Sequence, residues 1–342
     1  MTPDLALALP GFTWRDLFVP ERLAELHEKF LADLALEAPD VAERFAAYRR
    51  SLGEGMKPEA ISAVLCDVAP HVSAFVARLF RVEDERRSSM RDADHVAPVF
   101  RMKDQLVKRR ALKRGEVAFD AVLDAAARKM LSAAGVTDPD DERAVALFAC
   151  DLLDLDHDVK RGEPRAELAK SVITRVHGAV EGAAALPDSP PYREATRTTV
   201  AACLDLLERW LLMRRRDPAI AAWMAFRLPQ PMDFDQLVQI RRPIAARAEE
   251  IHGPESHRRH RDGFALTDER MNPMEVRDHV EYCLYCHERD KDTCSKGFRD
   301  KDGSYKANPL GIPLAGCPLD EKISEMHLLR KQGDSIGALA LV

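Results

Sequence analysis

The feature that most constrains the fold is a helical spacing of apolar residues that recurs along most of the chain. Between residues 22 and 36, leucines and one phenylalanine recur every three or four positions, the spacing of one helix face. Runs that alternate apolar and polar residues, as half-buried strands do, are essentially absent. Similar helical stripes follow at 39–48, 57–79, 117–131, 138–155, 165–180, 193–216, 218–228 and 234–250. We therefore predict an all-α fold, with a multi-helix domain over residues 1–251.

Two of these helix starts carry chemical signals. Pro58 lies in the first turn of one helix, where its missing N–H costs nothing. The stripe at 138–155 opens with four acids among five residues, which the positive end of the helix dipole favours.

Bulk composition limits the partners. The chain has 342 residues, enough for two domains, and a formal net charge of -6. No overall basic character draws it to nucleic acid or to anionic lipid, so neither is expected as a partner. The first residues lack the basic start of a secretory signal. No stretch approaches about 18 apolar residues, so no membrane-spanning helix is expected.

The cysteines divide into two groups. Cys66, Cys150 and Cys203 lie singly within apolar helical patterns, as small buried residues do. An odd total of seven fits a reducing compartment better than a disulfide framework. We therefore expect a cytoplasmic protein.

The composition changes after the last stripe. Residues 252–271 are polar, basic and contain glycine, which predicts a linker. A cysteine-rich module is expected from residue 272 to residue 342.

The other four cysteines lie within this module. Cys283 and Cys286 form a Cys-x2-Cys pair, Cys294 follows after seven residues, and Cys317 precedes Pro318. Cysteines at such spacing are typical ligands of zinc or of an iron–sulfur cluster, and cluster-binding runs of the bacterial ferredoxin type end in Cys-Pro. These four are the candidate ligands, and no catalytic residue is predicted.

His287 leaves a choice open. As a neighbour of Cys286 it could complete a Cys3His zinc site, although adjacent ligands strain tetrahedral geometry. We favour a hydrogen bond from His287 to a cluster sulfur, or simple exposure.

The end of the chain favours the cluster. The last segment resembles the N-terminal iron–sulfur domain of the glutamate synthase small subunit and dihydropyrimidine dehydrogenase family of FAD- and NAD(P)-dependent oxidoreductases. That domain combines three early cysteines with a Cys-Pro-Leu that opens a helix. Cys283, Cys286 and Cys294 fall on the first three. The helix pattern is met, in order, by Cys317, Pro318, Leu319, Ile323, Glu325, Leu329, Gly333, Ala338 and Leu339.

Two features depart from the family. Residues 298–315 form an insertion between Cys294 and Cys317, with turn signals at Asp302-Gly303 and Asn308-Pro309. The resemblance implies that the first three cysteines serve one 4Fe–4S cluster and Cys317 a second, with further ligands downstream. The chain stops at Val342 with an apolar ending. Either the four cysteines hold one cluster, or the module is truncated, which we favour.

The resemblance implies electron transfer. No Gly-x-Gly-x-x-Gly or other cofactor motif occurs in the chain. FAD and NAD(P) would therefore belong to a flavin-containing domain or subunit on a continuation or a partner. The expected role is to relay electrons between that flavin domain and another acceptor. The alternative is a zinc-stabilised helical adaptor without redox activity.

Two charged segments are expected to have structural rather than functional roles. Residues 101–114 are basic with periodic apolar positions, which predicts an amphipathic helix with a solvated basic face. Residues 151–158 hold four aspartates and His157, and we expect an acidic helix end there rather than a metal site.

Overall fold

The computed structural model describes residues 5–162, 165–190, 192–255, 258–260, 263–264 and 270–342. The prediction of an all-α fold is confirmed. Within the described ranges every regular element is a helix, and extended pairing is limited to isolated bridges. The chain divides into two compact units, one of residues 1–91 with 229–342 and one of residues 92–228. Each unit is described by itself.

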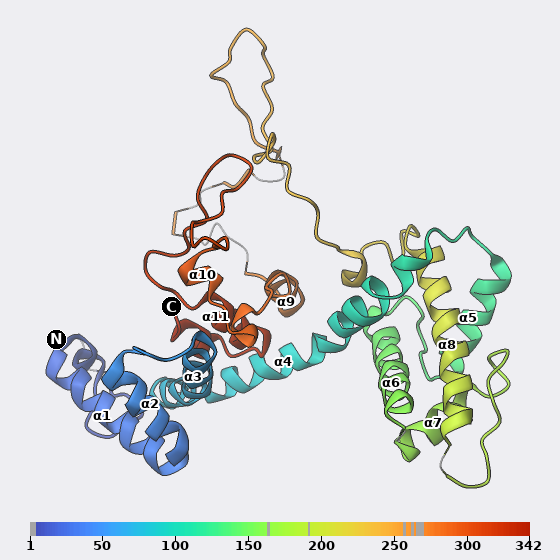
Figure 1. The fold of residues 1–342 in the computed structure, drawn as a ribbon, viewed down its shortest axis with the longest axis horizontal. Helices are drawn as coiled ribbons and strands as arrows, with labels where there is room; N and C mark the ends of the chain where they lie inside the picture. Colours follow the sequence, from blue (N-terminus) through green and yellow to red (C-terminus); the bar gives the residue numbers. More distant parts are fainter. Residues whose placement is uncertain (1–4, 163–164, 191, 256–257, 261–262, 265–269) are drawn as a thin grey trace. The chain divides into compact units, whose positions relative to one another are not determined.

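The first unit opens with helices that begin at prolines. After the short η1 (Trp14–Phe18), α1 (Pro20–Glu37), α2 (Pro39–Ser51) and α3 (Pro58–Phe80) each have proline at the first position, where its fixed φ suits a helix. These helices are the blue ribbons of Figure 1, and their apolar faces share one core. α4 (Glu83–Arg101) starts in this unit and continues into the second.

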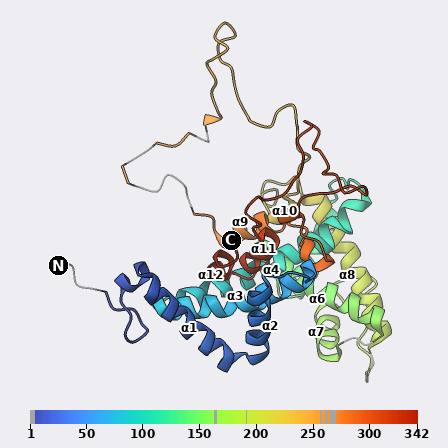
Figure 2. The same ribbon diagram turned by 60° about the vertical axis from the view of Figure 1, so that its left-hand side comes forward.

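Short helices of the last seventy residues complete the first unit. In chain order they are α9 (Pro273–Val280), η6 (Cys286–Arg289), α10 (Thr293–Lys296), α11 (Ile323–Lys331) and α12 (Ser335–Leu339). α11, α12 and η6 pack against α3, and Figure 2 shows α12 beside it. The cysteine segment and the N-terminal helices therefore form one packed body.

The second unit is a separate group of helices. It holds η2 (Met102–Lys108), η3 (Ala111–Arg114), α5 (Ala121–Ala133), α6 (Glu142–Arg161), α7 (Ala166–Val176), α8 (Arg193–Arg214) and η4 (Met224–Phe226). α8 packs against α5, α6 and α7. Fully buried side chains at this core include Met130, Leu152, Leu155, Ile173, Leu207 and Trp210.

Two predicted helices are wrong. Residues 218–228 form turns around the three-residue η4, and residues 234–250 hold no helix. In the second segment Pro243 removes a backbone donor and biases residue 242 away from helical dihedrals. Its apolar residues find no packing surface, since Leu237 and Val238 are exposed. Most helical stability comes from packing an apolar face, so the stripe alone does not make a helix.

The predicted linker, residues 252–271, falls partly outside the described residues. Residues 256–257, 261–262 and 265–269 lie outside them. The described part of the linker holds no α-helix, and His252 forms one isolated bridge with Arg241.

α3 passes a length-and-composition test for crossing a membrane. It is the one such helix in the described part of the chain, with a mean hydropathy of 1.6. The expectation of no membrane-spanning helix stays a prediction. The apolar core helix of a folded domain passes the same test. α3 also carries Asp67 and Arg78 and packs against α2, α11 and α12, which is how a core helix behaves.

Candidate functional site: the cysteine loops

The Cys-x2-Cys pair forms a tight turn after α9. Tyr285, between the two cysteines, takes the left-handed conformation with φ of 47°. Its backbone N–H donates to Cys283 Sγ at 3.4 Å, and its hydroxyl donates to the Val280 carbonyl at 3.1 Å. Burial, and then the charge of Glu281, raise the pKa of Tyr285 well above its usual range. The tyrosine therefore stays neutral and holds the turn in place.

Cys294 lies beside this turn. Asp292 caps α10 by accepting the Ser295 N–H at 3.3 Å, and Thr293 donates from its hydroxyl to Cys286 Sγ at 3.1 Å. Burial raises the pKa of the Cys294 thiol, and the charges of Cys283 and Cys286 raise it further. The structure therefore brings these three predicted residues into one electrostatic neighbourhood.

Cys317 reaches the same region through its backbone. Its N–H donates to the Cys294 carbonyl at 2.8 Å. At this point the backbone segments around Cys294 and Cys317 cross at close range. Two glycines with positive φ, Gly297 and Gly316, make this crossing possible. A Cβ on Gly297 would lie 2.4 Å from the Leu314 carbonyl oxygen, and a Cβ on Gly316 would lie 2.4 Å from the Ser295 carbonyl oxygen. Any side chain at either position would push the two loop segments apart.

The insertion between Cys294 and Cys317 is an ordered loop that closes at its base. Phe298 N–H donates to the Leu314 carbonyl at 2.9 Å, and Leu314 N–H donates to the Lys306 carbonyl at 2.7 Å. Both predicted turns are present: Gly303 N–H donates to the Asp300 carbonyl at 3.0 Å and Gly311 N–H to the Asn308 carbonyl at 2.9 Å. The insertion therefore leaves Cys294 and Cys317 close along the backbone despite their separation in sequence.

A second layer of side chains lies behind the cysteines, and the sequence analysis missed one of its members, Ser324. His287 is buried, with Nδ1 2.7 Å from Ser324 Oγ, so the alternative of simple exposure is wrong. Ser324 Oγ lies 3.7 Å from Cys283 Sγ. The histidine thus contacts a sulfur through a serine hydroxyl rather than directly. A serine in a helix is too common for its position alone to have marked this role.

Glu325 is the most unusual group near the site. Its side chain is 2% exposed; Oε1 accepts a hydrogen bond from Ser62 of α3, and Oε2 has no partner in the described structure. Burial raises the pKa of the Cys66 thiol to about 12, with the Glu325 charge as the next cause. The sequence had marked Glu325 only as one position of the Cys-Pro-Leu helix pattern.

Cysteine thiolates are suitable ligands for a soft metal, but the side chains of these cysteines do not converge as a ligand set in the described structure. All seven cysteines are free, and thiolates suit zinc and iron–sulfur clusters alike. Among the residues that the structure describes, no three His, Cys, Asp or Glu side chains converge as metal ligands. The gathering of Cys283, Cys286 and Cys294 is therefore a neighbourhood rather than a coordination shell.

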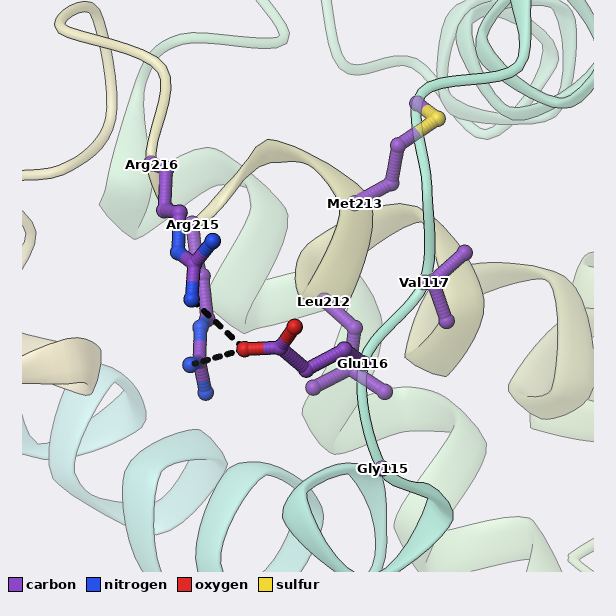
Figure 3. Close-up of a pocket in the computed structure, with 7 residues that line it drawn as sticks. All are labelled: Gly115, Glu116, Val117, Leu212, Met213, Arg215 and Arg216. Carbon is purple, nitrogen blue, oxygen red and sulfur yellow. Dashed lines mark hydrogen bonds and ion pairs between the residues drawn. The ribbon is translucent and has the colours of Figure 1, made fainter.

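A small pocket in the second unit offers no comparable chemistry. Figure 3 shows Arg215 and Arg216 directed at one oxygen of Glu116, at 3.8 and 2.5 Å. The rest of the lining is Gly115, Val117, Leu212 and Met213. The charges of this pocket are already paired with each other, so it is not a candidate for the function.

The basic run at 101–114 is less solvated than predicted. It forms η2 and η3 rather than a regular α-helix. Arg110 and Arg114 both donate to Glu208, a buried carboxylate of α8, at 2.5 Å each. Its apolar positions are buried, as an amphipathic segment requires. Two of its arginines therefore pair with a buried carboxylate of the second unit.

The acidic run at 151–158 lies within α6, and its carboxylates are paired with cations. Asp154 and Asp158 both form ion pairs with Arg165, at 3.1 and 2.7 Å. Asp156 contacts Arg110 at 3.1 Å and Lys160 at 2.8 Å. These contacts account for the aspartates without a metal.

The N-terminal helices are similar to a known family of helical domains. Residues 7–81 match the RP005 N-terminal alpha-helical domain family. These residues hold α1, α2 and α3.

One curated relative is similar over a limited length. The Uncharacterized protein RP005 of Rickettsia prowazekii (strain Madrid E) is 34% identical over 114 residues, which is 31% of this chain. The chain spans about a third (35%) of that relative. No solved structure matches the chain.

Proposed function

We propose that the C-terminal segment is the iron–sulfur electron-transfer portion of a flavin- and NAD(P)-dependent oxidoreductase. The flavin domain would belong to a continuation or a partner. One observation carries the proposal: three thiols of the family pattern share a neighbourhood in which hydrogen-bond donors point at two sulfurs. Thr293 donates to Cys286, and Tyr285 N–H donates to Cys283. Donors directed at sulfur are typical of the second layer that orients metal-ligating cysteines.

Cys283, Cys286, Cys294 and Cys317 would hold the cluster. When bound, a 4Fe–4S cluster supplies one-electron transfer at a potential set by its ligands, hydrogen bonds and burial. The chain's own contribution is to keep the cysteine turns in place. Tyr285 fixes the Cys-x2-Cys turn, and the crossing at Gly297 and Gly316 holds Cys317 beside Cys294.

A zinc-stabilised helical adaptor is the second candidate function. The same thiols favour it, because zinc takes all-thiolate sites readily. A redox role is not needed to explain a buried second layer, since structural zinc sites have one as well.

Metal analysis and spectroscopy separate the two. The full chain is purified without oxygen, analysed for iron, sulfide and zinc, and then reconstituted with iron and sulfide. We expect iron and sulfide with a broad absorbance near about 400 nm, lost in Cys286→Ser but kept in Cys150→Ala. Stoichiometric zinc without iron would favour the adaptor. Neither metal, with no absorbance after reconstitution, would refute both.

A further inference from the structure

We propose that the N-terminal helical domain is a docking platform that binds α11 and α12 and so holds the cysteine loops in position. The proposal stands apart from the choice of metal. It concerns the face of α3 that carries Ser62, Cys66, Ala69 and Ser73, whose spacing of four, three and four residues places them on one side of a helix. The partner of this face is the C-terminal helix pair of the same chain.

Two buried carboxylates of the helix pair find their partners on the platform. Glu325 of α11 accepts a hydrogen bond from Ser62. Asp334, which caps α12 and is 1% exposed, accepts one from Ser73 and pairs with Arg86 of α4 at 2.9 Å. A carboxylate buried without partners is strongly unfavourable. α11 and α12 would therefore be poorly stable in this arrangement without α3 and α4.

The network around Asp334 is specific rather than a single contact. Arg86 Nε donates to Ser73 Oγ at 2.6 Å, so the serine links the arginine and the carboxylate. Ser89 of α4 donates to the Gly333 carbonyl at 2.8 Å, which satisfies the backbone at the turn between α11 and α12. Charge, hydroxyl and backbone contacts thus all meet at one end of the helix pair.

The same face of α3 also allows α12 to approach closely. At Gly337 of α12 a Cβ would lie 3.3 Å from the Ala69 carbonyl oxygen of α3 and 3.0 Å from the Asp334 carboxylate. Ala69, Leu329 and Ala338 form a small apolar core between these helices. Small residues on both sides let the two backbones approach, and the polar contacts flank this apolar centre.

The platform also reaches the cysteine loops. Glu59 N–H, at the start of α3, donates to Asp290 at 3.3 Å, in the loop between Cys286 and Cys294. Ser324, which contacts Cys283 and His287, directly precedes Glu325. Docking of α11 on α3 therefore fixes a residue that contacts the predicted ligands. This gives the family-matched domain a role: it positions the cysteine segment.

A cut between the two parts tests the platform. A protease site is inserted between Gly253 and Pro254 of the full chain, and the cleaved, metal-free, reduced protein is analysed by gel filtration and sedimentation velocity. We expect residues 1–253 and 254–342 to remain together at micromolar concentration. Separation of the fragments, with helical circular dichroism unchanged, would overturn the proposal.

Variants identify the contact responsible. Asp334→Asn should raise the dissociation constant of the cleaved pair roughly a hundredfold, the scale for breaking a buried charge pair. Asp302→Asn, in an exposed turn of the insertion, is the matched control and should leave it unchanged. Equal weakening by both would refute the assignment. If Asp334→Asn does not fold, Arg86→Lys keeps the charge and should weaken association about tenfold.

A second measurement separates positioning from general stability. In the uncleaved chain, Asp334→Asn should increase the alkylation rate of Cys294 but not that of Cys150, which lies in the other unit. An unchanged Cys294 rate would show that the platform does not hold the cysteine loops. Because the protein is metal-free, neither result depends on the iron–sulfur proposal.

Discussion

The crossing of backbones at the base of the insertion gives a prediction with a built-in control. Gly297 and Gly303 have nearly the same dihedral φ, 77° and 86°. A Cβ at Gly303 would meet nothing within 4 Å, whereas at Gly297 it would lie 2.4 Å from one carbonyl oxygen and 2.6 Å from a carbonyl carbon. Alanine meets a conformational penalty at both positions, because both have positive φ. Gly297, with ψ of 176°, lies in a region essentially restricted to glycine, and only there does a steric clash add to the penalty.

The magnitudes follow from these two terms. A non-glycine residue in the left-handed region costs about 1–2 kcal/mol, which is the whole effect expected for Gly303→Ala. Gly297→Ala adds overlap with backbone atoms that cannot rotate away, so the two loop segments must separate and lose the hydrogen bond from Cys317 N–H to the Cys294 carbonyl. A lost, partly buried hydrogen bond adds about 1–3 kcal/mol. We expect a total of roughly 3 kcal/mol or more.

Amide hydrogen exchange measures this directly. The Cys317 N–H donates across the crossing, and its exchange rate reports the free energy of local opening. Gly297→Ala should speed its exchange by on the order of a hundredfold or more relative to the wild type. Gly303→Ala should leave it nearly unchanged, because the strain lies in the turn at the far end of the insertion. Equal rates in the two variants would refute the crossing.

Other contacts give shorter tests. Asp120 caps α5 by accepting from Val122 N–H at 2.8 Å, so Asp120→Ala should destabilise the second unit by about 1 kcal/mol in urea unfolding. Burial raises the pKa of the Cys203 thiol to about 12, so iodoacetamide at pH 8 should leave it unmodified in the native protein, and rapid modification would contradict its burial. The pKa of Asp292 is lowered in the folded state: burial opposes this, but hydrogen bonds from Lys322 and Ser295 outweigh it. A depressed carboxyl pKa stabilises above its unfolded value near 3.8 and loses that contribution as the pH falls through the folded value. Acidification below about pH 4 should therefore loosen the α10 loop in hydrogen exchange, and Asp292→Asn should make that loop less sensitive to pH.

The helices could be predicted from the sequence because their determinants are local. Apolar spacing and first-turn prolines define α1, α2 and α3 almost to the residue. The segment at 234–250 shows the limit of this reasoning, since a stripe without a surface to pack on does not become a helix.

The candidate site was accessible from the sequence only in part. The spacing of Cys283, Cys286 and Cys294 pointed to their gathering, and both turn signals of the insertion correspond to turns in the structure. The partners of Glu325 and Asp334 could not be predicted, because Ser62 and Ser73 lie more than 260 residues away in the chain. A serine on a helix carries no local sign of a distant carboxylate.

That separation has a consequence for how the protein is made. The first unit consists of the two ends of the chain, with residues 92–228 between them. During synthesis the intervening unit is complete, and domains tend to fold as units when they emerge. The face of α3 must wait until α12, ending at Leu339, has left the ribosome. The entropic cost of closing such a long loop grows only slowly with its length. The late arrival of α12 therefore delays folding of the first unit but lowers its stability little. Until then, the face of α3 with Ser62, Cys66, Ala69 and Ser73 lacks its partner, and it is the stretch of nascent chain that a chaperone would need to cover.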